Sequence, residues 1–469
     1  MIKDLFRKKT PEMIQDTVEH SRLKRELSAF DLALIGISCV IGTGIFVATG
    51  QGASLAGPGV ILSYAVAAIC CALCAFTYAE LATMFPIAGS TYSFCYAAFG
   101  EIIAWIIGWD LLLEYLVSSS AVASGWSSTL VGVLRSMGIN LPHALTNSPL
   151  AGGIVDLPAV LVVMFITWIL YRGVKESANW NNAMVAVKVG VIVLFIIMGM
   201  THVHLVNLKP LLPFGWKGVM AGASIVFFAF IGFDDISTAA EETANPKRDV
   251  PLGVGICVAV VILLYMLVAF TLCGIVPFRQ IDVNDALPSA LRMIGINWGG
   301  DLVAVGGIVG MIATILVINY GQIRIFMTMA RDGLLPPAFE KIHPVCRTPH
   351  ICTWITGIIC AVIAGFFPFS VIIDLCNIGT LFAFILVSIG VIVLRKTMPD
   401  VERKFRLPGV PFTPLLTIAM CVYLMAYLSP WTWLRFAIWL IVGGSLYFLY
   451  GYKHSALRRN CVEAPTTEA

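Results

Sequence analysis

Gly36-Ile37-Ser38-Cys39-Val40-Ile41-Gly42-Thr43-Gly44-Ile45-Phe46 is the stretch that decides the fold, because glycines interrupt an apolar run long enough to cross a membrane. A second interruption lies in Phe227-Phe228-Ala229-Phe230-Ile231-Gly232-Phe233-Asp234-Asp235. Glycine permits backbone torsions that unwind a helix, and the freed peptide groups must then face protein, ligand or water, never lipid. The two breaks therefore predict a ligand site, although glycine also suits close packing between helices.

The composition is that of a membrane protein. Of the 469 residues, 59% are hydrophobic and 12% are charged, whereas a soluble globular chain is roughly 45–50% apolar and about 25% charged. The net charge of +3 is small and its basic residues are spread over short segments, so no nucleic-acid partner is expected. The 13 cysteines mostly lack the paired spacing of a zinc site, and we expect small buried hydrophobes, no metal site and no cofactor.

Apolar runs of roughly 20 residues, the length that crosses a bilayer, recur along the chain. Runs of this length are helices, because a barrel strand needs only about ten alternating residues. The sequence thus predicts an all-α integral membrane protein of twelve transmembrane helices. The expected spans are 31–57, 59–84, 99–130, 156–173, 181–201, 217–240, 251–276, 300–330, 350–367, 370–394, 410–428 and 431–451.

Basic residues indicate the orientation, since short loops rich in Lys and Arg stay on the cytoplasmic side. They are dense in 1–30, which we interpret as an amphipathic cytoplasmic segment, and they recur after spans four, six, eight and ten and in the expected tail 452–469. The opposite loops hold only Arg135, Lys209, Lys217, Arg279 and Arg292. We expect a multi-pass protein of the cell membrane with both termini in the cytoplasm.

The first break suits an α-amino acid. The half-helix that begins near Thr43 would offer unpaired N–H groups and a positive dipole end to a carboxylate, while the carbonyls of Val40 and Ile41 could accept from an ammonium group. The substrate side chain would then meet apolar groups such as Phe228 and Ile318, with Asn319 as the polar candidate. The two breaks lie five spans apart, in corresponding places of a possible five-plus-five inverted repeat, which favours a transporter.

Charged side chains at membrane depth cost about 2.5–3.5 kcal/mol on insertion scales, so each needs a partner or a task. Lys188 could reach back to the interface by its long stem, or its ammonium could take the place of a sodium ion near the broken helix and carry a proton. Asp234 could cap the next half-helix or pair with a cation. The full set of candidates for ion or proton coupling is Asp110, Glu114, Lys188, Asp234, Asp235, Arg324 and Asp374.

For two further polar residues, a purely structural role competes with a role in coupling. Glu114 follows Asp110 by four residues and shares its helix face, which fits a polar stripe toward the bundle interior as well as structural hydrogen bonding. Tyr265 could donate to the same network, although a single tyrosine in a membrane span is commonly packing alone.

The chain resembles the amino acid, polyamine and organocation transporter superfamily and, within it, bacterial relatives of the cationic amino acid transporters. The likeness covers Ala29 to His454. It is carried by Gly42-Thr43-Gly44-Ile45-Phe46, Pro86-Ile87-Ala88-Gly89-Ser90-Thr91-Tyr92, Gly108-Trp109-Asp110-Leu111-Leu112-Leu113-Glu114-Tyr115, Phe228 to Asp234, Glu241-Glu242-Thr243-Ala244-Asn245-Pro246 and Arg331-Asp332-Gly333-Leu334-Leu335-Pro336.

The resemblance implies a leucine-transporter-like fold with inverted repeats over 31–201 and 217–394 and peripheral spans over 410–451. It implies that Phe228 gates the site and that Lys188 stands where a sodium ion is bound in other relatives, against the unwound part of span one. Asp234, Glu114 and Tyr265 match polar positions of proton-coupled relatives. By likeness, Thr43, Gly44 and Ile45 would hold the substrate carboxylate, and the carbonyls of Val40 or Ile41, Phe228, Ala229 and Ile231 its ammonium.

A cationic substrate would need a reachable carboxylate, which span eight does not offer beside Ile318 and Asn319, so small neutral amino acids such as alanine are expected. The sequence favours proton symport by alternating access, with amino acid exchange or transport of cationic amino acids as alternatives. Neither a large extramembrane domain nor a nucleophile elbow or phosphate loop is present to indicate a receptor or an enzyme. The expected partners are an amino acid, protons and the lipid bilayer, with or without a small single-span membrane protein.

Overall fold

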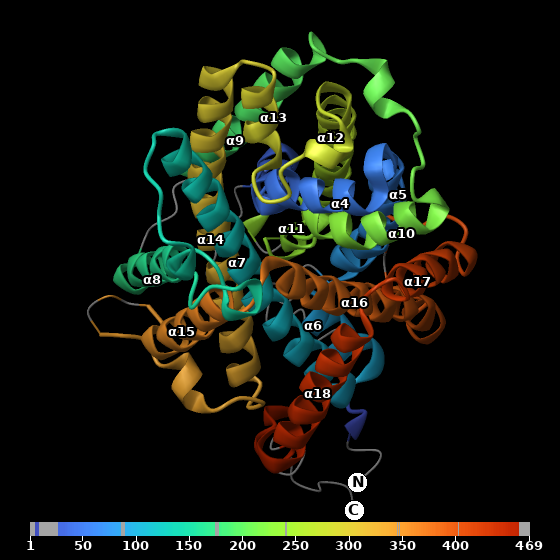
Figure 1. Ribbon diagram of the computed structural model, residues 1–469. Coiled ribbons are helices and arrows are strands. Elements are labelled where there is room, and N and C mark those ends of the chain that lie inside the picture. Colours follow the sequence, from blue (N-terminus) through green and yellow to red (C-terminus); the bar gives the residue numbers. More distant parts are fainter. Residues whose placement is uncertain are drawn as a thin grey trace, which may run out of the picture.

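The computed structural model describes residues 5–8, 27–85, 90–173, 178–239, 242–344, 346, 348–401 and 403–458, and it is an all-helical bundle (Figure 1). Within these residues, 8 helical segments are long and apolar enough to cross a membrane. Shorter apolar helices of 10–17 residues accompany them. These are α3 (Ala29–Val40), α8 (Leu157–Arg172), α15 (His350–Phe366) and α17 (Phe412–Met425).

The first expected span is broken where the glycines predict. Helix α3 begins at a capping box between Ser28 and Asp31 and ends at Val40. Ile41 then turns to an extended conformation with φ −77° and ψ 91°. The chain becomes helical again in a π-helical turn at Gly44–Ala48 and continues as α4 (Thr49–Ala56).

The second break follows helix α10 (Gly215–Val226) and a single 3-10 turn at Phe227–Phe230. Ile231 is extended, and Gly232 has a φ of 110°, a left-handed conformation that favours glycine over residues with a side chain. The chain then re-enters a short helix, α11 (Asp235–Thr238). The two breaks contact each other, because a Cβ atom at Gly44 would overlap the backbone of Ala229. The glycines thus serve both unwinding and close approach.

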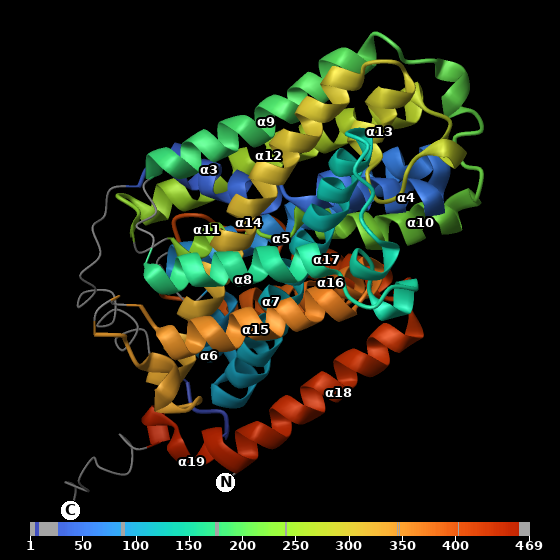
Figure 2. The same cartoon turned by 60° about the vertical axis from the view of Figure 1, so that its left-hand side comes forward.

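Long helices surround the two breaks. They are α5 (Val60–Met84), α7 (Glu101–Ser136), α9 (Ala178–Met200), α12 (Pro246–Ile275), α14 (Asn297–Arg331), α16 (Phe369–Thr397) and α18 (Pro430–Leu446). Helix α12 packs on α3 and α5, and α7 lies between α14 and α16. In Figure 2, α18 runs along the outside of the bundle. In the most apolar 18 residues of the segment that contains α18, only 22% are buried, whereas the corresponding share for α7 is 78%. Helix α18 is therefore peripheral.

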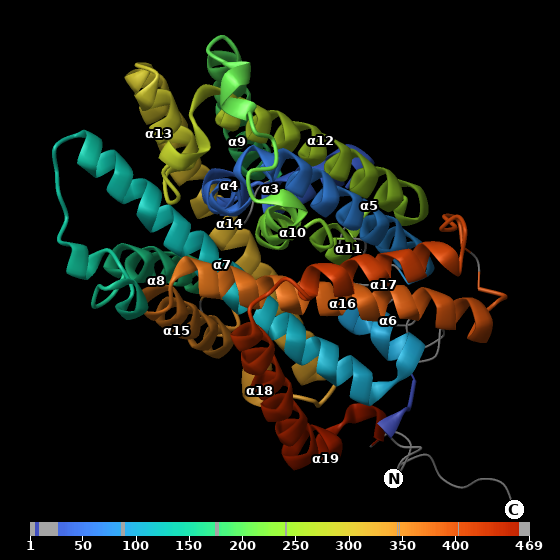
Figure 3. The same ribbon diagram turned by 45° about the vertical axis from the view of Figure 1, so that its right-hand side comes forward.

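Two helices lie between the expected spans and were not predicted. Helix α6 (Ser90–Phe99) is separated from α7 by Gly100, whose φ is 98°. Helix α13 (Ala286–Met293) precedes α14 and is strongly amphipathic, with one face buried. On one flank, α8 and α15 lie side by side (Figure 3). The likeness motifs at 86–89 and Glu241, most of the segment 1–30 and residues 459–469 of the expected tail lie outside the described residues.

Both described ends of the chain meet at one end of the bundle. The amide of Glu101 donates to the carbonyl of Arg7 at 3.0 Å, and the amide of Ala456 donates to the carbonyl of Asp332 at 2.9 Å. Glu101 begins α7 and Asp332 follows the end of α14, so both contacts lie beside the same face of the molecule. Ends on one face agree with an even number of crossings.

Candidate functional site

A small cavity of about 40 Å³ lies where the two breaks meet. Both breaks supply part of its wall, and α7 and α14 supply the rest. Most of the lining is apolar, with carboxyl groups and hydroxyls on one part of the wall. The lining residues are Cys39, Val40, Gly42, Thr43, Gly44, Glu114, Tyr115, Ser118, Val122, Phe228, Ile231, Gly232, Asp234, Asp235, Thr314 and Ile318.

The break in the first span leaves peptide groups at the wall. Ile41 and Gly42 lie outside any helix, and the first N–H groups of the helical segment that starts at Gly44 have no acceptor within the helix, as in every helix. The hydroxyl of Thr43 donates to the carbonyl of Val122 on α7 at 3.2 Å. This bond fixes the start of the half-helix, with its positive dipole end at the cavity.

Lys188 contacts the end of α3, on the N-terminal side of the break. Its side chain is fully buried, and Nζ donates to the carbonyl of Ser38 at 2.6 Å and to the hydroxyl of Thr314 at 2.7 Å. The Thr314 hydroxyl lies 3.4 Å from the carbonyl oxygens of both Ser38 and Ile41. The ammonium therefore lies among oxygen atoms at the end of α3 and does not extend to a membrane interface.

Tyr265 on α12 contacts the same helix end. Its hydroxyl donates to the carbonyl of Val40 at 3.0 Å, and its ring packs edge-on against Tyr64 and tilted against Phe230. The last carbonyls of a helix have no partner within the helix. Here Ser38 and Val40 obtain theirs from α9, α14 and α12. The Val40 carbonyl keeps a second lone pair for a ligand.

Three carboxyl groups line the cavity: Glu114 from α7 and Asp234 and Asp235 from the second break. Tyr115 donates a hydrogen bond to Asp235. The Oε2 atom of Glu114 is buried without a hydrogen-bond partner among the described residues. The capping interpretation of Asp234 is wrong, because its side chain makes no cap hydrogen bond to α11. These carboxyl groups come from α7 and the second break, whereas the sequence argument considered α14 alone.

Phe228 lies at the outer wall of the cavity. Its ring packs at 88° against Phe369, the first residue of α16, with 6.2 Å between the ring centroids. Beyond Phe369 lies a second cavity of about 190 Å³, which shares Thr146 and Asn147 with a third of about 410 Å³. The two rings thus separate the central cavity from a larger polar vestibule.

Some of the predicted substrate-binding residues line the cavity and others do not. Val40, Thr43, Gly44, Phe228, Ile231 and Ile318 line the cavity, whereas Ile41, Ile45, Ala229 and Asn319 lie outside its described lining. Asn319 is buried, and its Oδ1 lies 3.9 Å from the sulfur of Cys360 on α15. Successive helical side chains point roughly 100° apart, so Ile318 faces the cavity and Asn319 does not.

Several lining residues were missed from the sequence: Tyr115, Ser118, Val122 and Thr314. Thr314 precedes Ile318 by four residues and Ser118 follows Glu114 by four, so helix periodicity was a signal for both.

Asp110 shares the helix of Glu114, yet it lies against Gly379 of α16, where a Cβ would be 2.9 Å from its Oδ1. Arg324 pairs with Glu242 at 3.5 Å, and Asp374 accepts from Thr432 at 3.3 Å. These three lie outside the described lining.

Comparison with known proteins finds relatives along nearly the whole chain. A profile described as amino acid permease matches residues 27–446. The methylthioribose transporter of Bacillus subtilis (strain 168) is 46% identical over 458 residues, which cover 97% of this chain and 99% of that one. The branched-chain amino acid permease BcaP of the same organism is 46% identical over 461 residues, with 97% and 99% covered. The cationic amino acid transporter 4 of Homo sapiens is 29% identical over 567 residues, covering 94% and 89%.

Proposed function

Because the chain belongs to the amino acid permease family, we propose that it carries small neutral L-amino acids, such as alanine, together with protons and by alternating access. It is a multi-pass membrane transporter and not an enzyme. The observation that carries the proposal is the cavity between two facing helix breaks. A zwitterion bound there would meet peptide groups of both breaks.

The proposed architecture has twelve crossings. Spans one to five over 31–201 and six to ten over 217–394 form two inverted repeats, and α17 and α18 are peripheral. The support is positional: the breaks after α3 and α10 lie five spans apart and touch each other. The contacts of Glu101 and Ala456 at one face support a common side for the termini, and the basic loops support the proposal that this side is cytoplasmic.

In the proposed site, the N–H groups of Thr43, Gly44 and Ile45 bind the substrate carboxylate. The ammonium group binds carbonyls of Val40 or Ile41 and of Phe228, Ala229 and Ile231. Ile45 and Ala229 contribute backbone atoms alone, so side chains that face away from the cavity do not conflict with this assignment. Phe228 gates the site from the vestibule.

The residues that line the cavity indicate which kind of substrate side chain fits there. Phe228, Ile231 and Ile318 supply an apolar surface, and a cavity of about 40 Å³ favours a small group. Asn319 faces Cys360 of α15, so its role in the proposed site is structural and not substrate contact. A cationic amino acid is the second candidate, because Glu114, Asp234 and Asp235 line the same cavity. The two relatives that are 46% identical have different substrates in their names, so identity at this level does not decide between the candidates.

Proton coupling is assigned to Lys188, Asp234, Glu114 and Tyr265. The ammonium of Lys188 occupies a place among carbonyl and hydroxyl oxygens that would otherwise suit a sodium ion. Loss of its proton would weaken its bonds to Ser38 and Thr314 and free the end of α3 to move. Substrate binding and proton release thereby act on the same helix end.

The test is uptake of labelled alanine into proteoliposomes that contain the purified protein. Symport predicts accumulation that requires an inward proton gradient and that proceeds into liposomes without internal amino acid. Uptake that ignores the gradient and requires internal alanine would instead identify an exchanger. Competition by glycine, alanine, leucine and lysine in the same assay separates the small neutral from the branched-chain and the cationic candidates.

A further inference from the structure

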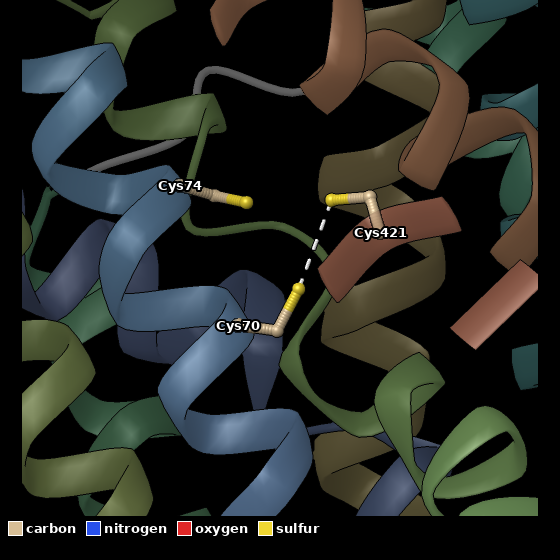
Figure 4. A group of neighbouring side chains, drawn as sticks. All are labelled: Cys70, Cys74 and Cys421. Carbon is tan, nitrogen blue, oxygen red and sulfur yellow. Dashed lines mark hydrogen bonds between the residues drawn. The ribbon is translucent and has the colours of Figure 1, made fainter. Parts of the chain in front are cut away.

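Three cysteines that are distant in sequence meet inside the bundle. Cys70 and Cys74 lie four residues apart on α5 and therefore share one face of that helix. Cys421 lies on α17, across the contact between the two helices. Figure 4 shows the three side chains pointing toward one another. Their exposed fractions are 0%, 1% and 0%, so the cluster is closed off from solvent and lipid.

The sulfur positions are close to those of a metal–thiolate site. All three sulfur atoms lie within 4.8 Å of one another, and Cys70 Sγ and Cys421 Sγ are 3.7 Å apart. Zinc–sulfur bonds are about 2.3 Å long, and tetrahedral geometry then places sulfur atoms about 3.8 Å apart. One edge of the cluster already has this length, and the other edges need to shorten by about 1 Å at most.

We propose that Cys70, Cys74 and Cys421 form a binding site for a soft divalent metal ion of the zinc class. Thiol sulfur is a soft ligand, which favours such ions over Mg²⁺ or Ca²⁺. All three thiols release their protons to water on binding, because the thiolate is the form of cysteine that coordinates a metal ion. The three thiolates and the divalent ion together carry one net negative charge, so burial opposes binding and the metal–sulfur bonds must offset that cost.

The site would join a peripheral helix to the centre of the bundle. Helix α17 packs against α16, α5 and α10. Helix α5 also touches the second break, and its Tyr64 shares a hydrogen bond of 2.6 Å with Thr49 of α4. A metal ion between α5 and α17 would therefore fix α17 beside the helices that form the substrate cavity. The expected effect is a higher unfolding temperature for the metal-bound protein.

The experiment uses Cd²⁺, whose thiolate complexes absorb in the ultraviolet, with the full chain in detergent and a phosphine reductant. Since the sulfur atoms are buried, one sample is titrated after purification and a second is isolated from cells grown with added zinc. We expect saturation at one Cd²⁺ per chain, or one zinc ion per isolated chain. Either signal should be lost in Cys421→Ser and in Cys70→Ser and kept in Cys95→Ser, a control in which another buried thiol is removed.

Each variant is first checked for a single monodisperse species and a cooperative thermal transition, so that misfolding is not mistaken for loss of the site. If Cys421→Ser does not fold, Cys74→Ser, which changes only α5, is measured in its place. Equal metal content in the wild-type protein and the cysteine variants would overturn the proposal. So would the absence of metal from both wild-type samples.

Discussion

The ammonium nitrogen of Lys188 lies 2.6 Å from the carbonyl oxygen of Ser38, so a cation from α9 caps the end of α3 at the point where the first span unwinds. The carbonyl groups at a helix end carry partial negative charge, which a cation stabilises. This relationship places a group that can lose a proton at the element whose movement would open the site. It is the physical basis of the proposed coupling.

Replacement of this lysine tests the coupling. Lys188→Ala should reduce gradient-driven alanine uptake to the level of empty liposomes, because no ammonium remains to exchange a proton at the break. Lys217→Ala, which removes an exposed lysine at the start of α10, should leave uptake unchanged. Alanine-induced thermal stabilisation of each variant is measured in parallel to separate binding from coupling. Full gradient-driven uptake by Lys188→Ala would rule out the role of this residue.

The close approach of the two breaks gives a second prediction. A Cβ atom at Gly44 would overlap the Cα of Ala229, so Gly44→Ala must push the breaks apart. We expect destabilisation of about 1–3 kcal/mol, the usual range for overpacking, together with loss of alanine uptake. Gly190→Ala on α9 is the matched control, since a Cβ there meets no atom within 4 Å. Thermal unfolding and uptake of both variants provide the measurement, and equal behaviour of the two would contradict the proposed geometry.

The breaks themselves were predictable from the sequence, and the orientation of side chains around them was not. Glycine and Asp residues mark the interruptions directly at Gly42 and Gly232, because they disturb runs whose length is otherwise set by the bilayer. Asn319, by contrast, was predicted as a substrate contact, yet it lies outside the described lining of the cavity and its Oδ1 is 3.9 Å from the sulfur of Cys360. An error of one residue along a helix turns a side chain by roughly 100°, and apolar spans have no strong periodicity to fix the rotation.

Contacts between segments that are distant in the chain could not be predicted from the sequence either. Tyr115 and Asp235 are separated by 120 positions, and the ring pair of Phe228 and Phe369 joins the 3-10 turn after α10 to α16. Cys70 and Cys421 form a similar case, in which each residue alone resembles a small buried hydrophobe. A single sequence gives no information about which helix faces meet, so these features required the structure.

The ring pair at the outer wall yields a prediction about selectivity. Phe228→Ala removes the ring that lies between the central cavity and Phe369, so the cavity should enlarge toward the vestibule. We expect leucine to compete with labelled alanine more strongly in this variant than in the wild type. Phe165→Ala, which removes an exposed ring on α8, should leave the competition ratio unchanged. A ratio that is the same in Phe228→Ala and the wild type would argue against a wall formed by Phe228.

The segment that joins α12 to α13 provides a prediction about pH. Asp285 lies outside the spans, and burial raises its pKa from 3.8 to about 7, although the Arg292 guanidinium 3.0 Å away opposes the shift. Arg292 also pairs with Asp301 at 3.0 Å, so its charge is divided between two carboxyl groups. Asp285 Oδ1 has no hydrogen-bond partner among the described residues, which leaves its charged form poorly compensated.

The sign of the pH effect follows from proton uptake. Between pH 3.8 and about 7 the folded protein keeps a proton on Asp285 that the unfolded chain releases, so the contribution of this group to stability falls as the pH rises through that window. Asp285→Asn cannot ionise and should show a shallower fall of unfolding temperature from pH 5 to pH 7 than the wild type. Asp400→Asn, which removes an exposed carboxyl group outside the ion pairs of Arg292, is the control and should keep the wild-type slope. Identical slopes for Asp285→Asn and the wild type would show that Asp285 is already ionised throughout this range and that Arg292 compensates its charge.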